Sequence, residues 1–208
     1  MIDRSLYPLQ GRVLAAPARA LAAKGVSANQ ITLAGLVLAI LAALAISFQF
    51  YIVGLFFILL NRLSDGLDGA VARLGPADPR GAYLDITLDF LFYGMIPLAF
   101  ALANPVQNAV PAAVLLSCFL GTGTSFLAWS AAGAKAGLDA KAYPTKGILY
   151  LGGLTEGFET IALFVLACLM PAWFPWLAYI FAFACLLTIG MRIHVAWTTL
   201  APTESPHP

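Results

Sequence analysis

Charged residues are scarce in this sequence of 208 residues, since only 10% are Asp, Glu, Lys or Arg. An ordinary soluble domain carries roughly 25% charged residues. Here 61% of the residues are hydrophobic and the mean hydropathy is +0.88. The formal net charge is only +1, so the chain has no basic surplus that would attract a nucleic acid. These shortages argue against a water-soluble domain, a disordered chain and a nucleic-acid partner, and they favour an integral membrane protein.

Cysteines and the common cofactor motifs are also scarce. The cysteines Cys118, Cys168 and Cys185 lie in apolar runs and match no metal-binding spacing, so we expect them to be small buried residues. No Walker motif, GxGxxG or HExxH occurs, which leaves ATP, dinucleotide and zinc-hydrolase chemistry without support. The polar, proline-interrupted N-terminus predicts no cleavable signal peptide.

Long apolar segments are what the sequence has in abundance. A helix that spans a membrane needs about 20 mostly apolar residues. Three segments are cleanly apolar (31–48, 109–133 and 173–197), and three more are apolar but contain acids (51–73, 81–103 and 147–170). We therefore predict an all-α polytopic membrane protein with six transmembrane helices over 31–198. They form a single domain over residues 1–200, and 201–208 are predicted to be a disordered tail.

Lys and Arg are distributed unevenly over the connections between these segments. The turns near 49, 104–108 and 170–175 contain none, so all eleven basic residues fall on the opposite side. The positive-inside rule then places both termini in the cytoplasm. Residues 5–24 mix leucines with Arg12, Arg19 and Lys24, which predicts an amphipathic juxtamembrane helix, a loosely ordered basic arm being the alternative. Ser27 or Asn29 is expected to cap the first span.

Acidic residues inside the apolar segments are the most informative feature. A charge at the bilayer centre costs about 2.5–3.5 kcal/mol, so these acids need a compensating cation or a wet cavity that opens to the cytoplasm. Six of the ten acids lie in or near predicted spans: Asp65, Asp68, Asp85, Asp89, Glu156 and Glu159.

The spacing of the four aspartates points to metal chemistry. Asp65 and Asp68 share one helical face, and Asp85 and Asp89 share a face of the next helix, after a turn rich in glycine and proline. Oxygen ligands suit hard cations such as Mg²⁺, and four carboxylates can hold two ions about 3.5–4 Å apart, as in phosphoryl-transfer sites. The alternative is that the aspartates are surface charges on a loop. This alternative does not explain Asp85 and Asp89, which lie within the apolar run 83–100. Room for a bulky ligand is left by the small residues Gly69, Ala72 and Gly81. Two arginines, Arg73 and Arg80, flank this space.

These residues resemble a known signature. Residues 65–73 read DGLDGAVAR and residues 81–89 read GAYLDITLD, which is similar to the pattern D-x2-D-G-x2-A-R followed by G-x3-D-x3-D of the CDP-alcohol phosphotransferase (phosphatidyltransferase) family. The spacer of seven residues between Arg73 and Gly81 is slightly shorter than in that family, at a turn, where length changes are tolerated. The run GGLTEGFET at 152–160 also resembles a branch of small bacterial inner-membrane members.

The resemblance implies a fold and a set of roles. The fold would be six membrane helices around a polar cavity that faces the cytoplasm, in a homodimer in the bacterial inner membrane. The cofactor would be two Mg²⁺ ions, for which Mn²⁺ could substitute, and Asp89 would be both the general base and a metal contact. The implied metal ligands are Asp65, Asp68, Asp85 and Asp89, and the implied CDP-binding residues are Asp65, Gly69, Ala72, Arg73 and Gly81.

The acceptor of the transferred group is left open by the sequence. Glu156 and Glu159 are expected on one face of the fifth span, where they could bind hydroxyls, an amine or the basic loop, or form an ion pair with Lys146, Arg192 or another helix. The cluster Lys135, Lys141 and Lys146, with Arg192, could bind a phosphorylated acceptor or only anchor the cytoplasmic side. The acids favour a neutral or amino alcohol and the lysines favour a phosphate.

The predicted activity is phospholipid synthesis, in which a phosphatidyl group passes from CDP-diacylglycerol, or a related CDP-alcohol, to a small alcohol with release of CMP. One alternative is transfer of a phospho-alcohol from a CDP-alcohol to a lipid hydroxyl. A transporter that uses membrane acids as an ion relay would be expected to show paired, repeated halves, which the sequence lacks. A catalytically silent scaffold is the last alternative, and the intact motif argues against it.

Overall fold

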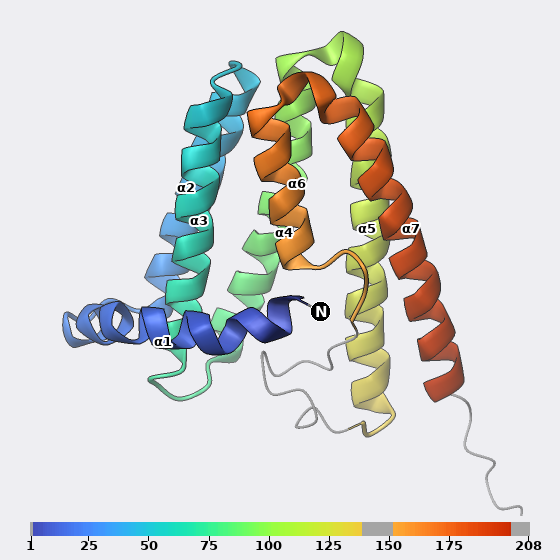
Figure 1. Ribbon diagram of the computed structural model, residues 1–208. Helices are drawn as coiled ribbons and strands as arrows, with labels where there is room; N and C mark the ends of the chain where they lie inside the picture. The colour runs from blue at the N-terminus through green and yellow to red at the C-terminus, as the bar shows by residue number, and fades with distance from the viewer. Residues whose placement is uncertain (1, 139–151, 201–208) are drawn as a thin grey trace, which may run out of the picture.

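The computed structural model describes residues 2–138 and 152–200, and it is built from helices (Figure 1). No β-strand occurs within these two ranges, which confirms the prediction of an all-α chain. A short 3-10 turn, η2 (Pro171–Trp173), precedes the last helix. The helices are α1 (Ile2–Ala23), α2 (Ala28–Ser47), α3 (Tyr51–Ala72), α4 (Pro79–Ala103), α5 (Pro105–Lys135), α6 (Gly157–Leu169) and α7 (Phe174–Thr199).

Side-chain caps and prolines set several helix starts. Ser27 begins α2 with a capping box, in which its hydroxyl accepts from the Gln30 N–H (3.3 Å) and the Gln30 side chain accepts from the Ser27 N–H (2.9 Å). This confirms Ser27, of the two expected residues, as the cap. Asp78 caps α4 just before Pro79, and Asn104 caps α5 just before a proline.

Helix α2 is the central support of the half that carries the aspartates. Both α3 and α4 pack on α2, α4 also packs on α5, and α5 packs on α7. Helix α1 lies across one end of the bundle, at the foot of α3 (Figure 1), and its extent agrees with the helix predicted over 5–24. A small apolar cluster joins α1 to α2 and α3, and it contains Leu14, Ala18, Ile31, Ala70 and Val71.

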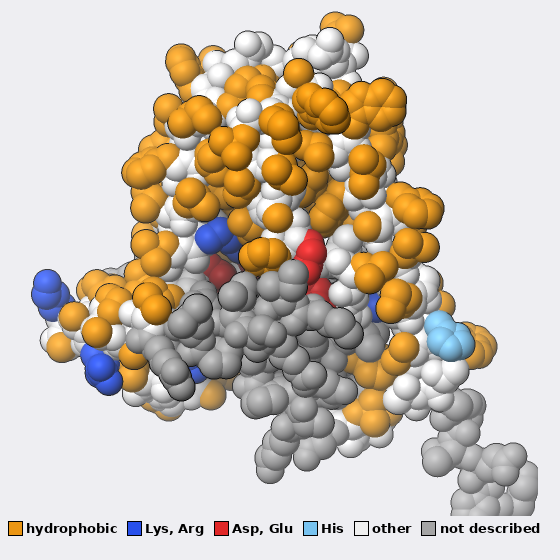
Figure 2. Space-filling model, viewed as in Figure 1, with side chains coloured by type: hydrophobic (Ala, Val, Ile, Leu, Met, Phe, Trp, Pro, Cys, Tyr) orange, Lys and Arg blue, Asp and Glu red, His pale blue; other side chains and the backbone are white. Residues whose placement is uncertain are grey.

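The main core lies in the half of the bundle away from α1 and is rich in aromatic rings. Phe100 of α4 stacks on Phe174 at the start of α7, with ring centroids 4.5 Å apart, and on Tyr51 on its other side, at 5.7 Å. The three cysteines are buried, which confirms the expectation for them. Figure 2 shows apolar side chains over most of the surface beside this core, and acidic and basic side chains at its lower edge.

Glycines allow several of the helices to approach closely. A Cβ at Gly54 would lie 2.5 Å from Ile46 Cγ1, and one at Gly121 would lie 2.6 Å from Ile189 Cδ1. A Cβ at Gly123 would collide with the ring of Phe90. The glycines at 121 and 123 therefore serve helix packing.

Four of the described helices are long and apolar enough to cross a membrane: α2, α4, α5 and η2 with α7. Helix α3 has 22 residues but carries Arg62, Asp65 and Asp68, and α6 has 13 residues, roughly 20 Å of helix. The fifth segment differs most from the prediction. A helix was expected from 147, but residues 152–156 are not helical and α6 begins at Gly157, because Glu156 caps it there.

Candidate active site

Three of the four motif aspartates converge on one point. Asp65 and Asp68 extend from the last turns of α3, and Asp85 extends from the second turn of α4. One carboxylate oxygen of each residue lies within 4.8 Å of the others. Asp68 is buried, with 5% of its surface exposed, while the other two are half-buried. Three carboxylates this close repel one another unless a cation lies between them.

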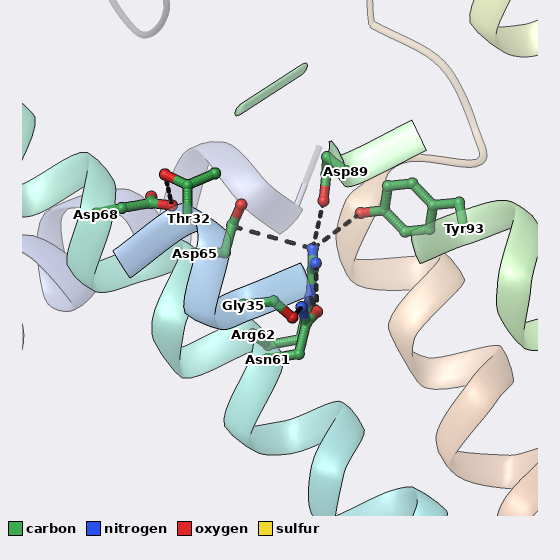
Figure 3. Close-up of polar contacts among 8 residues, drawn as sticks. All are labelled: Thr32, Gly35, Asn61, Arg62, Asp65, Asp68, Asp89 and Tyr93. Atoms are coloured by element: carbon green, nitrogen blue, oxygen red, sulfur yellow. Dashed lines mark hydrogen bonds and ion pairs between the residues drawn. The ribbon is translucent and has the colours of Figure 1, made fainter. Parts of the chain in front are cut away.

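The buried face of α2 holds one of these carboxylates in place. The hydroxyl of Thr32 donates a hydrogen bond of 2.8 Å to Oδ2 of Asp68, and both residues are buried (Figure 3). Two further contacts join α2 to α3 nearby, since Asn61 Nδ2 donates to the Gly35 carbonyl (2.8 Å) and Ser64 Oγ donates to the Ile31 carbonyl (2.9 Å). These bonds fix the rotation of α3 that points its aspartates away from the lipid-facing side.

The fourth aspartate has a different partner. Arg62 Nη1 donates to Asp89 Oδ1 at 2.8 Å and lies 4.0 Å from Asp65 Oδ2 (Figure 3). Asp89 is outside the group of three carboxylates, although Asp85 is only one helical turn away. The structure therefore places a fixed positive charge between Asp89 and the group.

The donor set fits a divalent cation. Asp65, Asp68 and Asp85 offer only carboxylate oxygens, which are the ligands that Mg²⁺ and Mn²⁺ accept, and no thiol or imidazole accompanies them in the group. A recess of about 20 Å³, roughly the space of a water molecule, lies against these three residues and Asp89. These residues are the ones that would hold a metal.

A cavity of about 1010 Å³ opens from the carboxylates. Its polar lining includes the aspartates, Gly69 and Arg73 from α3 and α4, and Thr155, Glu156 and Arg192 from the region of α6 and α7. Most of the lining is apolar and comes from α4, α5 and α6, where it includes Phe90, Tyr93, Leu116, Phe119, Leu120, Phe126, Leu127, Phe158 and Ile161. One space therefore combines anionic, cationic and apolar surfaces.

The residues expected to bind CDP are not all on this cavity. Asp65, Gly69 and Arg73 line it, and a Cβ at Gly69 would lie 3.4 Å from Arg73 Nη1. Ala72 is exposed at the end of α3 and Gly81 is half-buried, and neither lines the cavity. Gly81 instead lets α4 approach α2, because a Cβ there would lie 2.8 Å from Asn29 Oδ1. Arg80 is exposed and also lies off the cavity lining.

The two glutamates expected on one helical face form the N-terminal cap of α6. Oε1 of Glu156 accepts from the Gly153 N–H (2.9 Å), and Oε2 of Glu159 accepts from the Glu156 N–H (3.1 Å). Glu156 is buried and lines the cavity, whereas Glu159 is half-buried and does not. The pair thus has a local structural task, and only Glu156 faces the space that an acceptor could enter.

Of the basic residues expected near the acceptor, the structure describes Lys135 and Arg192. Lys135 is exposed at the end of α5, and Lys141 and Lys146 lie outside the described residues. Arg192 of α7 is buried, lines the cavity, and donates from Nη1 to the Thr122 carbonyl of α5 at 2.8 Å. Its guanidinium lies 5.7 Å from the ring centroid of Phe126.

Sequence reasoning did not select Thr32, Asn61, Arg62 or Tyr93 for the site. A signal existed for Arg62, because a cation three residues before Asp65 in an apolar helix is the compensating charge that the membrane acids require. No comparable signal marked Thr32, whose hydroxyl meets Asp68 only after α2 and α3 have packed together.

The chain belongs to the CDP-alcohol phosphatidyltransferase family, whose sequence profile matches residues 25–190. Inner membrane protein YnjF of Escherichia coli (strain K12) is 47% identical over 200 residues, which are 96% of this chain and 97% of YnjF. This relationship confirms the resemblance that the aspartate motif indicated.

Solved structures show the same fold. The crystal structure of Mycobacterium tuberculosis phosphatidylinositol phosphate synthase (PgsA1) with CDP-DAG bound has a TM-score of 0.67 at 22% identity, over 93% of this chain and 99% of PgsA1. The structure of PgsA1 in complex with manganese and citrate gives the same TM-score and identity, over 92% of this chain and 93% of that one.

Proposed function

We propose that this protein transfers a phosphatidyl group from CDP-diacylglycerol to a polar alcohol and releases CMP. The observation that carries the proposal is the shared cavity, in which three converging carboxylates and Arg73 adjoin an apolar wall. A soluble nucleotide needs the charged surface and not the apolar wall. A nucleotide that carries two acyl chains needs both, because its diphosphate is anionic while its chains are apolar.

Relatives support the choice of donor and metal. PgsA1, which has this fold, holds CDP-DAG in one structure and manganese in another. We propose Asp65, Asp68 and Asp85 as the metal ligands, and Arg73, with Gly69, as the contact of the donor's pyrophosphate. A divalent cation bound there would neutralise the diphosphate and stabilise the departing phosphate oxygen. Two Mg²⁺ ions, a homodimer and cytoplasmic termini stay predictions from the sequence.

In the proposed reaction, the acceptor hydroxyl approaches Asp89, whose carboxylate takes its proton. The acceptor oxygen then forms a bond to the phosphorus that carries the diacylglycerol, and the bond from this phosphorus to the bridging oxygen of the diphosphate breaks. CMP leaves with that electron pair, and the apolar wall retains the acyl chains of donor and product throughout.

The direction of transfer has one alternative, in which a CDP-alcohol gives its phospho-alcohol group to a lipid hydroxyl. Both reactions place a lipid against the apolar wall, and they differ in which substrate carries the nucleotide. Purified protein in detergent is therefore given two substrate sets with Mg²⁺, and CMP is measured by chromatography. One set is CDP-diacylglycerol with a panel of free and phosphorylated alcohols, and the other is diacylglycerol with CDP-alcohols.

We expect acceptor-dependent CMP release only in the first set, and loss of this release in Asp89→Asn and Asp68→Ala. Asp78→Asn is the matched control, because it removes a carboxylate that does not line the cavity and Asn also caps helices well. CMP release only in the second set would establish the alternative reaction. No CMP release in either set, from protein that binds Mn²⁺, would refute the proposal.

A further inference from the structure

Arg62 occupies an unusual place for a basic residue of an apolar helix. Its side chain is 18% exposed and lies beside two of the four motif carboxylates, 2.8 Å from Asp89 and 4.0 Å from Asp65. The signature that identifies the family does not include this position. The charge of this arginine is therefore a feature of the chain that the motif does not explain.

Contacts with Asn61 and Phe92 fix the position of the Arg62 guanidinium. Its Nε and Nη2 donate to Oδ1 of Asn61 at 2.9 and 2.6 Å, and the amide of Asn61 is itself tied to the Gly35 carbonyl of α2 (Figure 3). Its Cζ lies 4.1 Å from the ring centroid of Phe92, which packs against its face. A planar fork fixed in this way directs Nη1 toward Asp89 at 2.8 Å, with the Tyr93 hydroxyl farther away at 3.5 Å.

The carboxylate of Asp89 therefore has two competing partners. It lies one helical turn from Asp85 and lines the same small recess as the three converging carboxylates, so a bound cation is within its neighbourhood. Its hydrogen bond to Arg62 instead keeps it outside that group. A carboxylate that serves as a ligand is less available to take a proton, because the metal withdraws its electrons.

We propose that Arg62 is a positioning residue that holds Asp89 out of the metal-binding group and so reserves it for proton transfer. The resting enzyme then binds one divalent cation through Asp65, Asp68 and Asp85, and the guanidinium supplies positive charge in place of the second ion that the family resemblance implies. The reserved role of Asp89 rests on the proposed function, whereas the competition for its carboxylate does not.

Mn²⁺ binding tests the competition without any substrate. Purified protein in detergent is titrated with Mn²⁺, and free Mn²⁺ is measured by electron paramagnetic resonance. In Arg62→Met, which loses the charge and keeps an apolar side chain, we expect Mn²⁺ to bind on the order of tenfold more tightly, or in a larger number of ions. Arg62→Lys should return binding to the wild-type level. Lys24→Met removes one exposed charge off the cavity lining and should leave the titration unchanged.

Two variants of Asp89 show whether Arg62 acts through this residue. Asp89→Asn alone keeps an oxygen for Arg62 and should bind Mn²⁺ as the wild type does, because Asp89 is not in the resting group. Adding Asp89→Asn to Arg62→Met should abolish the gain in Mn²⁺ binding. Unchanged binding in Arg62→Met, a gain that persists without Asp89, or weakened binding in Asp89→Asn would each overturn the proposal.

The single Asp89 variant remains informative if Arg62→Met does not fold, which size-exclusion chromatography in detergent reveals. Absence of CMP release together with the expected Mn²⁺ pattern would refute the proposed function alone. At saturating Mn²⁺, Arg62→Met should also lower kcat for CMP release while the KM for CDP-diacylglycerol stays within about twofold, since the donor's contacts are intact.

Discussion

The hydrogen bond from Thr32 to Asp68 gives the sharpest test of how α2 supports the carboxylates. Replacing Thr32 with Val keeps the branched shape and removes the hydroxyl that lies 2.8 Å from Oδ2 of Asp68. Both residues are buried, with 9% and 5% of their surface exposed, so water cannot readily replace the lost donor. A hydrogen bond to a charged group contributes about 1.5–3 kcal/mol.

This loss has a direct consequence for metal binding. Removing a residue that orients a metal ligand usually lowers metal affinity 10- to 100-fold, so we expect Thr32→Val to bind Mn²⁺ roughly 10- to 100-fold more weakly. The affinity is measured by Mn²⁺ titration of purified protein. Thr32→Ser, which keeps the hydroxyl, should retain most of the affinity.

The control for this prediction is Ser64→Ala in the same helix pair. Ser64 donates its hydroxyl hydrogen to the Ile31 carbonyl, so its loss weakens the α2–α3 contact while the Thr32–Asp68 bond is kept. We expect its Mn²⁺ affinity to stay near the wild-type value. Wild-type affinity in Thr32→Val, with the unfolding temperature preserved, would refute the view that α2 orients Asp68.

Three further predictions concern packing, capping and the metal. Gly54→Ala should destabilise the protein by about 1–3 kcal/mol, because its Cβ would lie 2.5 Å from the buried Ile46. Gly190→Ala is the control, because its Cβ would meet no atom within 4 Å, and it should not lower the unfolding temperature in detergent. Glu156→Ala should cost about 1 kcal/mol of stability by removing the cap of α6. Glu156→Gln keeps an acceptor oxygen and should retain most of the wild-type stability. Equal unfolding temperatures for the two variants would contradict the capping role. EDTA should abolish CMP release and excess Mn²⁺ should restore it, and activity that survives chelation would rule out the metal.

Hydropathy predicted five of the helices well, including two whose apolar runs contain acids. The segments over 31–48, 51–73, 81–103, 109–133 and 173–197 correspond to α2, α3, α4, α5 and α7. The fifth segment was predicted to include residues 152–156, which are not helical, because hydropathy does not register that Glu156 accepts hydrogen bonds from the backbone and starts a helix there. Local capping chemistry decided that boundary.

The sequence predicted those parts of the site that depend only on residue spacing along a helix. The spacing puts Asp65 and Asp68 on one face of a helix and Asp85 early in the next, and the three carboxylates converge because both helices pack on α2. The choice of Arg62 as the partner of Asp89 depended on a rotamer and on Asn61, and the apolar cavity wall depended on α5 and α6 packing far along the chain. Sequence spacing contains neither kind of information.

The position of α2 before α3 and α4 in the sequence also affects the order in which the site is assembled during synthesis. Chains are synthesised from the N-terminus and their parts fold in that order, so all four motif aspartates and the helix that braces them leave the ribosome before any residue of α6 or α7. A nascent chain that has reached Ala103 already contains every group needed to capture a cation. The cavity beside the carboxylates is completed only later, when the residues that α6 and α7 contribute to its lining have been made.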